Sequence, residues 1–392
     1  MRRAAAVLLV LAASACDDRL KPGRCEVDSD CASGMTCAQE MVAGVYHRCV
    51  QPDGGAGGDG GADVLPPECT DDRQCPAERP VCGVGGTCGP CAGASSVCAT
   101  RHPSAPVCGA SGACVECASN ADCGSAAKPA CDAQSSTCKA CTTDNDCAGR
   151  PGPGVCMAHQ DGRCASEAET IYVQQSAGCV MTADATAGSA ATPFCGLDKG
   201  AVALSPNRRL FVVRGTVQGT AWTLQGTNAD PQVSMVGQQN AVLAGGASPG
   251  LRVIGANLFG RGLKVTRSVD VGISVSGGAV LRLEDSSVDN NGGGGILLQQ
   301  AAFDLRNVTV TDNGPGTLNL ATWGGIAVVD PPTNGSKRFQ RVSILQNKGP
   351  GLSCSGAVDG DGVLAAQNST VDINPTCGIT SCGAPSATCG AM

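Results

Sequence analysis

The sequence predicts an all-β protein in which a parallel β-helix follows a series of small disulfide-rich modules with little regular secondary structure. Three observations support this prediction. Cysteines recur in groups of four through the first part of the 392-residue chain, short apolar runs separated by glycine and asparagine fill the second part, and no window shows a helical period. A chain of this length also has room for more than one domain.

The charge of the chain excludes one class of partner. Its formal net charge is −7, charged residues make up 16% of it, and no basic run follows the first residues. A surface that binds nucleic acid needs clustered lysine and arginine to neutralise phosphates. We therefore expect no nucleic acid among the partners.

The first 15 residues, MRRAAAVLLVLAASA, have the features of an export signal. Arg2 and Arg3 form a charged start, residues 4–12 an apolar stretch, and residues 13–15 a cleavage site of small side chains. The next residue is Cys16. The 27 cysteines are odd in number, so an exported chain keeps one thiol unpaired unless Cys16 is set apart. Two processing routes fit: cleavage that leaves Cys16 as a free thiol, or attachment of lipid to it.

The stretch LAASAC, residues 11–16, resembles the lipoprotein box of bacterial lipoproteins. That family prefers leucine three residues before the cysteine, whereas Ala13 stands there in this sequence. The resemblance implies that Cys16 carries acyl chains, that residues 16–24 form a tether, and that the protein is exported to the cell envelope as an outer-membrane or cell-surface lipoprotein. Its first partner is then the membrane, and stable anchoring needs more than one acyl chain.

Twenty of the other 26 cysteines form five modules of four within residues 25–49 and 69–164. The groups are Cys25, Cys31, Cys37, Cys49; Cys69, Cys75, Cys82, Cys88; Cys91, Cys98, Cys108, Cys114; Cys117, Cys123, Cys131, Cys138; and Cys141, Cys147, Cys156, Cys164. Residues 69–164 contain no Leu, Ile, Phe, Tyr or Trp, so burial of apolar surface cannot offset their chain entropy. We expect two disulfides per module, each contributing about 2–4 kcal/mol, with three pairings open for each module.

Metal binding by the modules is the alternative to cross-linking. The C-x-x-C junctions CGPC, CVEC and CKAC are also typical of zinc sites, but zinc needs reduced thiolates, and an exported chain meets an oxidising compartment. A carboxylate or amide lies three residues after the first cysteine of four modules, at Asp28, Asp72, Asn120 and Asp144. These side chains suit calcium or a tight turn, and we favour the turn because each module has too few carboxylates for calcium. We expect no metal and no cofactor.

The run of modules over residues 25–164 resembles the cysteine-rich repeats of surface lipoproteins from myxobacteria and related gliding bacteria. The resemblance implies a stalk or a binding module. Residues 50–68 interrupt the run and are rich in glycine and aspartate. This composition predicts a flexible, solvated linker.

Residues 165–380 show the pattern of the parallel β-helix. One strand recurs as GISV, GILL, GIAV and GLSC, starting at Gly272, Gly295, Gly325 and Gly351. Two further short strands lie in each interval, and the last of them leads to an asparagine, at Asn291, Asn313, Asn347 and Asn374. Stacked coils lie about 4.8 Å apart, so we expect these four amides to form a ladder. A β-sandwich is the alternative all-β fold, and it does not predict one asparagine per coil.

The last six cysteines lie at the two ends of this region. They are Cys179 and Cys195 near its start and Cys354, Cys377, Cys382 and Cys389 near its end. Middle coils are covered by their neighbours, whereas end coils expose unpaired strand edges. We therefore expect disulfides at both caps, with Cys179 bonded to Cys195, and a stapled tail at residues 381–392.

The segment from IYVQQSAGC to RLFVVRGT, residues 171–216, resembles the opening of right-handed parallel β-helix proteins of the pectin-lyase type. The resemblance implies a right-handed helix. It also implies a polysaccharide lyase, hydrolase or esterase activity, or non-catalytic adhesion. The fold alone does not choose among these functions.

No catalytic residue is assigned from the sequence. All three histidines, His47, His102 and His159, lie in the cysteine-rich part, which leaves the β-helix without a histidine base or a Ser-His-Asp triad. Glycoside hydrolysis needs only two carboxylates. The available aspartates are Asp285, Asp289, Asp304, Asp312, Asp330, Asp359, Asp361 and Asp372. Most stand beside Asn or Gly in expected turns, and the VDGDG stretch at 358–362 is interpreted as a turn in preference to a calcium contact.

Trp323 is the one aromatic candidate for contact with a ligand. It lies in the longest interval between repeats, which places it on an expected loop. There it would stack on a ligand or, alternatively, cover the apolar end of an enlarged turn.

These observations favour an exported, lipid-anchored surface protein with a non-enzymatic role in binding, adhesion or envelope structure. Its expected partner besides the membrane is a polysaccharide or a surface protein. One alternative is a carbohydrate-active enzyme, a polysaccharide lyase or hydrolase of pectin-lyase-like fold, which requires a cleft with two suitably spaced carboxylates. The other is a protein-binding or inhibitor module, which requires residues 69–164 to bind a protein by themselves.

Overall fold

The computed structural model describes residues 67–92, 94–219, 221–227, 232–246, 249–315, 323–369 and 371–379, and the backbone of 36–41 and 45–50. The expected export signal, Cys16, Asp28 and the tail with Cys382 and Cys389 lie outside the described residues. Within the described part of the chain, no helix combines the length and the apolar character that crossing a membrane requires.

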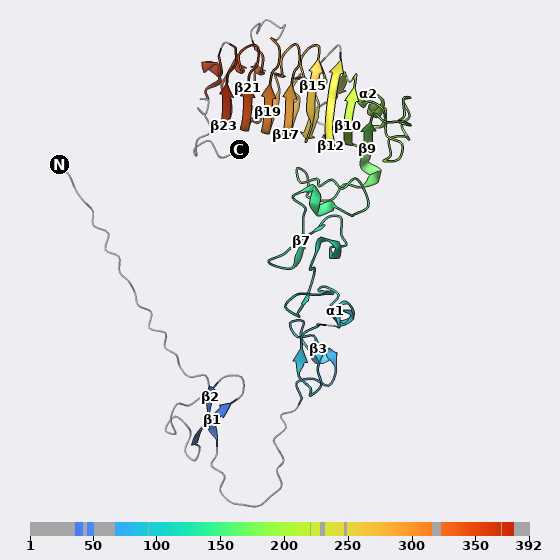
Figure 1. Ribbon diagram of the computed structural model, residues 1–392, viewed down its shortest axis with the longest axis vertical. Helices are drawn as coiled ribbons and strands as arrows, with labels where there is room; N and C mark the ends of the chain where they lie inside the picture. The colour runs from blue at the N-terminus through green and yellow to red at the C-terminus, as the bar shows by residue number, and fades with distance from the viewer. Residues whose placement is uncertain are drawn as a thin grey trace, which may run out of the picture. The chain divides into compact units, whose positions relative to one another are not determined.

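The chain divides into two units, Met1–Pro67 and Glu68–Met392. In the first unit, β1 (Thr36–Met41) and β2 (Val45–Val50) form an antiparallel hairpin (Figure 1). The backbone register places Cys37 opposite Cys49. This hairpin is the part of the first cysteine-rich module that the structure describes.

The second unit begins with four modules, each fastened by two disulfides. In every module the first cysteine bonds to the third and the second to the fourth. The bonds are Cys69–Cys82, Cys75–Cys88, Cys91–Cys108, Cys98–Cys114, Cys117–Cys131, Cys123–Cys138, Cys141–Cys156 and Cys147–Cys164. The structure thus selects one of the three pairings that the spacing leaves open.

Regular elements in these modules are short. The hairpin strands are β3 (Val81–Cys82), β4 (Cys88–Gly89), β5 (Val107–Cys108), β6 (Cys114–Val115), β7 (Ala130–Asp132) and β8 (Thr137–Lys139). The helices and 3-10 turns are η2 (Asp72–Gln74), α1 (Ser95–Arg101), η3 (Asn120–Asp122) and η4 (Asp144–Cys147). The third and fourth cysteines face each other across the hairpin, as Cys82 and Cys88 do. Cross-links therefore take the place of a core in these modules.

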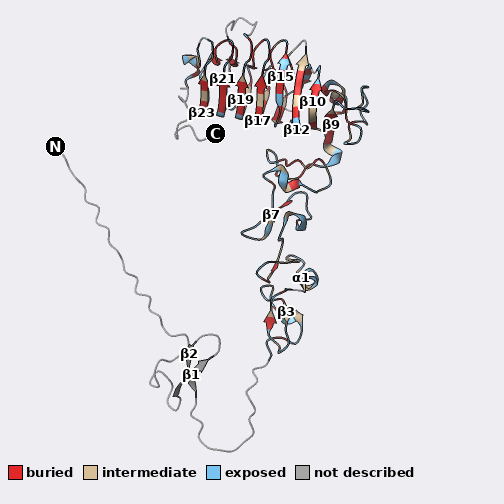
Figure 2. Ribbon diagram, viewed as in Figure 1, coloured by how far each residue is buried: buried red, intermediate tan, exposed pale blue. Residues whose placement is uncertain are grey.

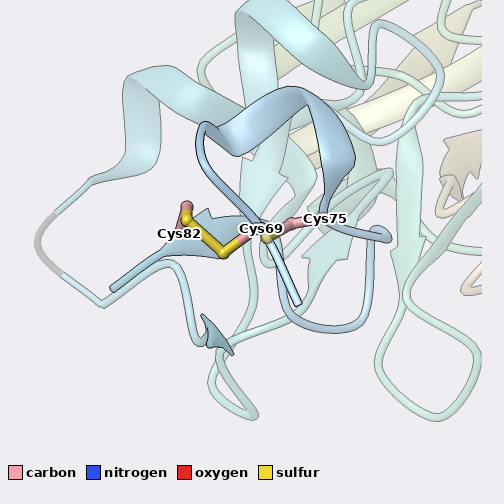
Figure 3. Close-up of side chains that lie close together, drawn as sticks. All are labelled: Cys69, Cys75 and Cys82. Atoms are coloured by element: carbon pink, nitrogen blue, oxygen red, sulfur yellow. A yellow bond between two sulfur atoms is a disulfide. The ribbon is translucent and has the colours of Figure 1, made fainter. Parts of the chain in front are cut away.

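The sulfur atoms of three cysteines gather closely in several modules. Those of Cys69, Cys75 and Cys82 all lie within 4.8 Å of one another. Figure 3 shows the bond between Cys69 and Cys82. Cys75 is bonded to Cys88. Zinc binds thiolates, and a sulfur in a disulfide is no longer one. In this oxidised state the cluster is a pair of cross-links.

The carboxylate or amide three residues after the first cysteine stabilises the module backbone. Asp72 accepts a hydrogen bond from the backbone N–H of Cys82 at 2.7 Å, and Asn120 accepts one from Cys131 at 2.8 Å. Asp144 does the same for Cys156 at 2.8 Å. The side chains therefore fill the role that the turn interpretation assigns to them.

The rest of the second unit is a parallel β-helix, with two sheets whose strands come from successive coils (Figure 1). The larger sheet contains β9 (Thr170–Gln174), β10 (Leu210–Gln218), β12 (Val233–Gly246), β14 (Asn257–Arg261), β15 (Lys264–Ser268), β17 (Val280–Asp289), β19 (Ala302–Thr311), β21 (Lys337–Leu345) and β23 (Asp359–Ala366). The smaller sheet contains β11 (Trp222–Gln225), β13 (Leu251–Ile254), β16 (Ile273–Ser276), β18 (Ile296–Gln299), β20 (Ile326–Val329) and β22 (Leu352–Cys354). All pairs within these two sheets are parallel, which confirms the predicted fold class.

The longer strands bend once and so serve two faces of each coil. The bend residues Asp285, Asn307 and Arg341 have φ values of 47°, 53° and 51°. They lie in the middle of β17, β19 and β21, where a left-handed residue turns the strand without ending its pairing. Two of the three short strands predicted for each coil are therefore halves of one bent strand.

Many residues in the strands of the β-helix are buried (Figure 2), and aliphatic side chains among them form its core. The residues that follow the recurring glycines form one column: Ile273, Ile296, Ile326 and Leu352 are paired in register and fully buried. Burying one such side chain contributes about 1.5–3 kcal/mol. The repeated GISV-like motif is thus the sequence signature of this column.

An asparagine column runs beside the core. The amide nitrogen of Asn291 donates to Oδ1 of Asn313 at 2.9 Å, and that of Asn313 donates to Asn347 at 3.0 Å. The next member is Asn368, which accepts from Asn347 at 2.9 Å. The prediction of Asn374 in this column was wrong: it caps η7 (Pro375–Cys377), where its side chain accepts from the N–H of Thr376. The final coil places Asn368 only 21 residues after Asn347, so Asn374 falls beyond the ladder.

Both ends of the described helix carry a disulfide. At the first coil, Cys179 bonds to Cys195 just before α2 (Leu197–Gly200) and η6 (Ala201–Ala203). At the last coil, Cys354 of β22 bonds to Cys377 of η7. These bonds hold the segments that cover the ends of the stack.

Candidate functional site: the junction cleft

The fifth cysteine-rich module, residues 141–164, packs against the outside of the first coils. Its Val155 and Met157, together with the adjoining Ala165, form a buried apolar cluster with side chains of β9, β10 and β12. The β-helix residues in the cluster are Tyr172, Leu210, Val212 and Val236. Both faces of these strands are therefore buried, one by the core and the other by the module.

His159 of the module contacts the β-helix directly. Its Nε2 lies 2.8 Å from Oγ of Ser234 in β12, and its ring stacks on Phe259 of β14 with centroids 3.6 Å apart. Burial, together with the nearby Arg261 and Arg282, lowers the pKa of His159 to about 4, and Asp161 opposes this shift. At neutral pH the imidazole is therefore uncharged.

An ion pair adds a second contact across the junction. Nη2 of Arg261 in β14 lies 2.6 Å from Oδ1 of Asp144, the same oxygen that accepts from the N–H of Cys156. Nearby, the amide of Gln238 donates to the carbonyl of Pro153 at 2.8 Å. Apolar packing, an ion pair and hydrogen bonds thus all join the module to the helix.

A cleft of about 610 Å³ opens beside this contact. The fifth module contributes Met157, Gln160 and Arg163, and the β-helix contributes Asn207 and Leu210 among others. Amide and guanidinium groups converge over an apolar floor, which is the usual make-up of a ligand site, and such sites favour domain interfaces. We take this junction cleft as the candidate site.

One wall of the cleft is held rigidly. The two terminal nitrogens of Arg163 each lie 2.5 Å from an oxygen of Glu169, and Nε of Arg163 lies 3.1 Å from Asp161. Burial raises the pKa of Glu169, but hydrogen bonds from Arg163 and from the N–H of Ser166 outweigh it and hold the pKa below its usual value. Glu169 is therefore ionised at neutral pH. Its two-point ion pair with Arg163, called the fork below, fixes this wall of the cleft.

A charged surface lies on the outward face of β14, β17, β19, β21 and β23. In one row across the strands, Arg282 pairs with Asp304, Asp304 with Arg338, and Arg338 with Asp359. In the next row, Glu284 lies between Arg261 and Arg306. Opposite charges on neighbouring strands stabilise the sheet.

Two carboxylates on this surface differ in their surroundings. Burial raises the pKa of Glu284, with Asp285 and Asp304 adding to the rise and Arg306 opposing it. Asp304 instead accepts from Nε and Nη2 of Arg306 at 3.1 and 2.7 Å. Glu284 and Asp304 are diagonal neighbours on paired strands, a spacing of about 7–8 Å.

The other predicted aspartates are mostly engaged with neighbours. Asp285 accepts from the amide of Asn307 at 2.6 Å in a groove of about 430 Å³, and Asp289 pairs with Lys264 at 2.9 Å. Asp312 accepts from the hydroxyl of Thr311, and Asp372 accepts from the amide of Asn368. The backbone N–H of Asp330 donates to the hydroxyl of Ser355. Asp359 and Asp361 of the VDGDG stretch line a hollow with Arg338. The eight aspartates are thus spread over the helix and do not gather in one site.

Trp323 is fully buried, so the prediction of contact with a ligand was wrong. It belongs to a cluster with Val271, Leu297 and Ala327 on the outer side of the smaller sheet. Its ring lies against Gly294, where a Cβ atom would come within 2.5 Å of it. The residue covers an apolar patch, as the alternative interpretation expected.

Sequence reasoning missed the role of His159. The β-helix has no histidine of its own, yet the fold brings one to its surface from a module 75 residues away from Ser234. The available signal was Met157 and Val155, since large apolar side chains are rare in these modules. That signal indicates a contact but not the partner.

Comparisons with known proteins establish neither a family nor a function for this chain. No family model matches this chain, and no curated protein matches it. Among solved structures, a crystal structure of pectate lyase Pel9A matches with a TM-score of 0.27 and 11% sequence identity. The match covers 52% of this chain and 78% of that chain.

Proposed function

We propose that this protein is an exported, envelope-anchored binding protein that holds its ligand in the junction cleft. The observation that carries the proposal is the polar cleft between the fifth module and the first coils. Its walls come from two parts that the apolar cluster and the Asp144–Arg261 pair lock together. A preformed site of this kind loses little free energy to ordering when it binds.

The proposed location of the protein, outside the cytoplasm and anchored to the envelope, follows from its cysteines. Ten disulfides among the described residues favour an oxidising compartment, as expected for an exported chain. The anchor is acyl chains on Cys16. In a bacterial host fed an alkyne-tagged fatty acid, the full chain should carry the tag and the Cys16→Ser variant should not. An untagged wild-type chain would refute the lipid anchor but would not bear on ligand binding in the junction cleft.

The proposed ligand is a surface polysaccharide. Gln160, Asn207 and Gln232 offer amides that both donate to and accept from hydroxyl groups, while the exposed Ala168 and Pro206 offer apolar contact. Planar polar groups of this kind suit a ligand with many hydroxyls. A protein ligand would need a larger and flatter apolar contact.

The test is retention of the full chain on a panel of immobilised polysaccharides. Gln160→Ala and Asn207→Ala should each weaken retention about tenfold, because each removes hydrogen bonds from a desolvated site. Asn240→Ala, in the separate groove near Asp285, is the matched control and should change nothing. Retention that survives both cleft variants would overturn the proposal.

A second candidate function is glycoside hydrolysis on the charged surface. It is favoured by Glu284, whose raised pKa suits a general acid, and by Asp304, which pairs with Arg306 and lies diagonal to Glu284. A separation of about 6.5–9.5 Å between two carboxyl groups leaves room for the water of an inverting enzyme. Release of new reducing ends by the full chain, lost in Glu284→Gln, would establish it. Retention without release would leave binding as the function.

A further inference from the structure

The charges around His159 are unevenly distributed. On the β-helix side, Arg261 of β14 and Arg282 of β17 both face the ring. On the module side, Asp161 is the acid that opposes them. Asp161 also binds Nε of Arg163, and Asp144 is engaged by Arg261. A positive charge on the imidazole would therefore meet two guanidinium groups with little compensation.

The contacts of His159 exist only while the hairpin that carries it is docked on the β-helix. The ring stacks on Phe259 at 3.6 Å and reaches Ser234 at 2.8 Å, so protonation places charge in a stacked and largely dehydrated position. When the hairpin moves away, the ring returns to water and to an ordinary pKa of about 6.5. Acid therefore favours the state in which the hairpin is released.

We propose that the fifth module is a pH-sensitive latch whose hairpin, residues 156–164, leaves the β-helix on acidification and opens the junction cleft. The cleft loses its wall at Gln160 in that state, while Arg163, at the base of the hairpin, keeps its ion pair with Glu169 and the coils from β17 onward stay folded. Only the effect of this opening on ligand binding rests on the proposed function. The movement of the hairpin itself is tested without any ligand.

The direction of the effect follows from the lowered pKa of His159. Docking is at full strength above pH 6.5, where the ring is neutral in both states. Between that value and about 4 the released state binds more protons, so the docking equilibrium weakens by up to about tenfold per pH unit. The apolar contacts of Val155 and Ala165, which flank the hairpin, do not titrate, and they limit the opening to the hairpin.

Hydrogen exchange of the full chain at pH 7 and pH 4.5, corrected for intrinsic rates, tests the latch. Peptides covering 157–163 and 257–261 should lose protection at pH 4.5, whereas peptides covering 302–311 should not. His159→Phe keeps an aromatic ring for Phe259 and removes the titration, so it should abolish the loss. His102→Gln, in another module, is the matched control and should behave as the wild type.

Histidine NMR provides a second measurement, the titration midpoint of His159, which would not change in the expected way if His159 had only a structural role. With three histidines in the chain, the resonance missing in His159→Phe identifies His159, and its midpoint should lie near 4. Arg282→Gln removes one opposing charge, so it should raise that midpoint and reduce the loss of protection at pH 4.5. The latch is overturned if the wild type keeps its protection at pH 4.5, or if the loss persists in His159→Phe. If His159→Phe is already unprotected at pH 7, Arg282→Gln decides: an unchanged midpoint and an unchanged loss overturn the latch.

Discussion

The side-chain amide of Asn313 donates to Oδ1 of Asn347 at 3.0 Å, and the backbone N–H of Asn313 donates to the same oxygen at 3.1 Å. The amide also donates to the carbonyl of Val288, and its own oxygen accepts two bonds from Asn291. Every donor and acceptor of this fully buried amide is thus used. The ladder couples three coils through groups that water cannot reach.

Replacing this amide should be costly. We expect Asn313→Ala to lower the free energy of unfolding by about 3 kcal/mol, because it leaves buried groups on both neighbours unsatisfied. Asn313→Asp should cost at least as much, since a carboxylate has no N–H to donate. Urea denaturation measures both. The control is Asn374→Ala, which removes only a cap and should cost about 1 kcal/mol. Equal losses at the two positions would show that the ladder does not stabilise the stack.

The strand bend at Arg341 offers a stabilising change. Its φ of 51° lies in the left-handed region, which disfavours residues with a Cβ by about 1–2 kcal/mol. Glycine also loses more chain entropy on folding, so Arg341→Gly should raise the free energy of unfolding by about 0.5–1 kcal/mol. Arg338→Gly, in the extended part of the same strand, should lower it. A decrease in both variants would contradict the strain at the bend.

Repetition explains how much of this fold was predictable. The column headed by Ile273 and the first three ladder asparagines recur once per coil within the same local motif, so the motif places them in register although the ladder intervals are 22 and 34 residues. The next ladder position follows after 21 residues, at Asn368 and not at Asn374. Trp323 stands on an irregular interval, where spacing carries no information about burial. The contact of His159 with Ser234 joins two non-repeating parts, so only the folded chain shows it.

The contact between Trp323 and Gly294 can be tested by a double-mutant cycle. Gly294 has a φ of 110°, and an added Cβ would lie 2.5 Å from the indole ring. Gly294→Ala should therefore lower the free energy of unfolding by about 2–3 kcal/mol through strain and overpacking. Trp323→Leu also destabilises, but the double variant should be more stable than the sum of the single changes predicts. Additive losses would show that the two residues do not compete for the same space.

Glu169 predicts a pH dependence with a definite sign. Its pKa is lower in the folded chain than its ordinary value of 4.5, so the fork with Arg163 stabilises the fold fully above that pH and weakens as the pH falls below it. Glu169→Gln should lower the free energy of unfolding at pH 7 by about 1–2 kcal/mol. The difference from the wild type should shrink between pH 4.5 and 3 in urea titrations, because protonation removes the same charge from the wild-type chain. Glu78→Gln, at an exposed position, is the control and should show no pH-dependent difference. A deficit in Glu169→Gln that stays constant down to pH 3 would mean that the charge of Glu169 does not hold this wall of the cleft.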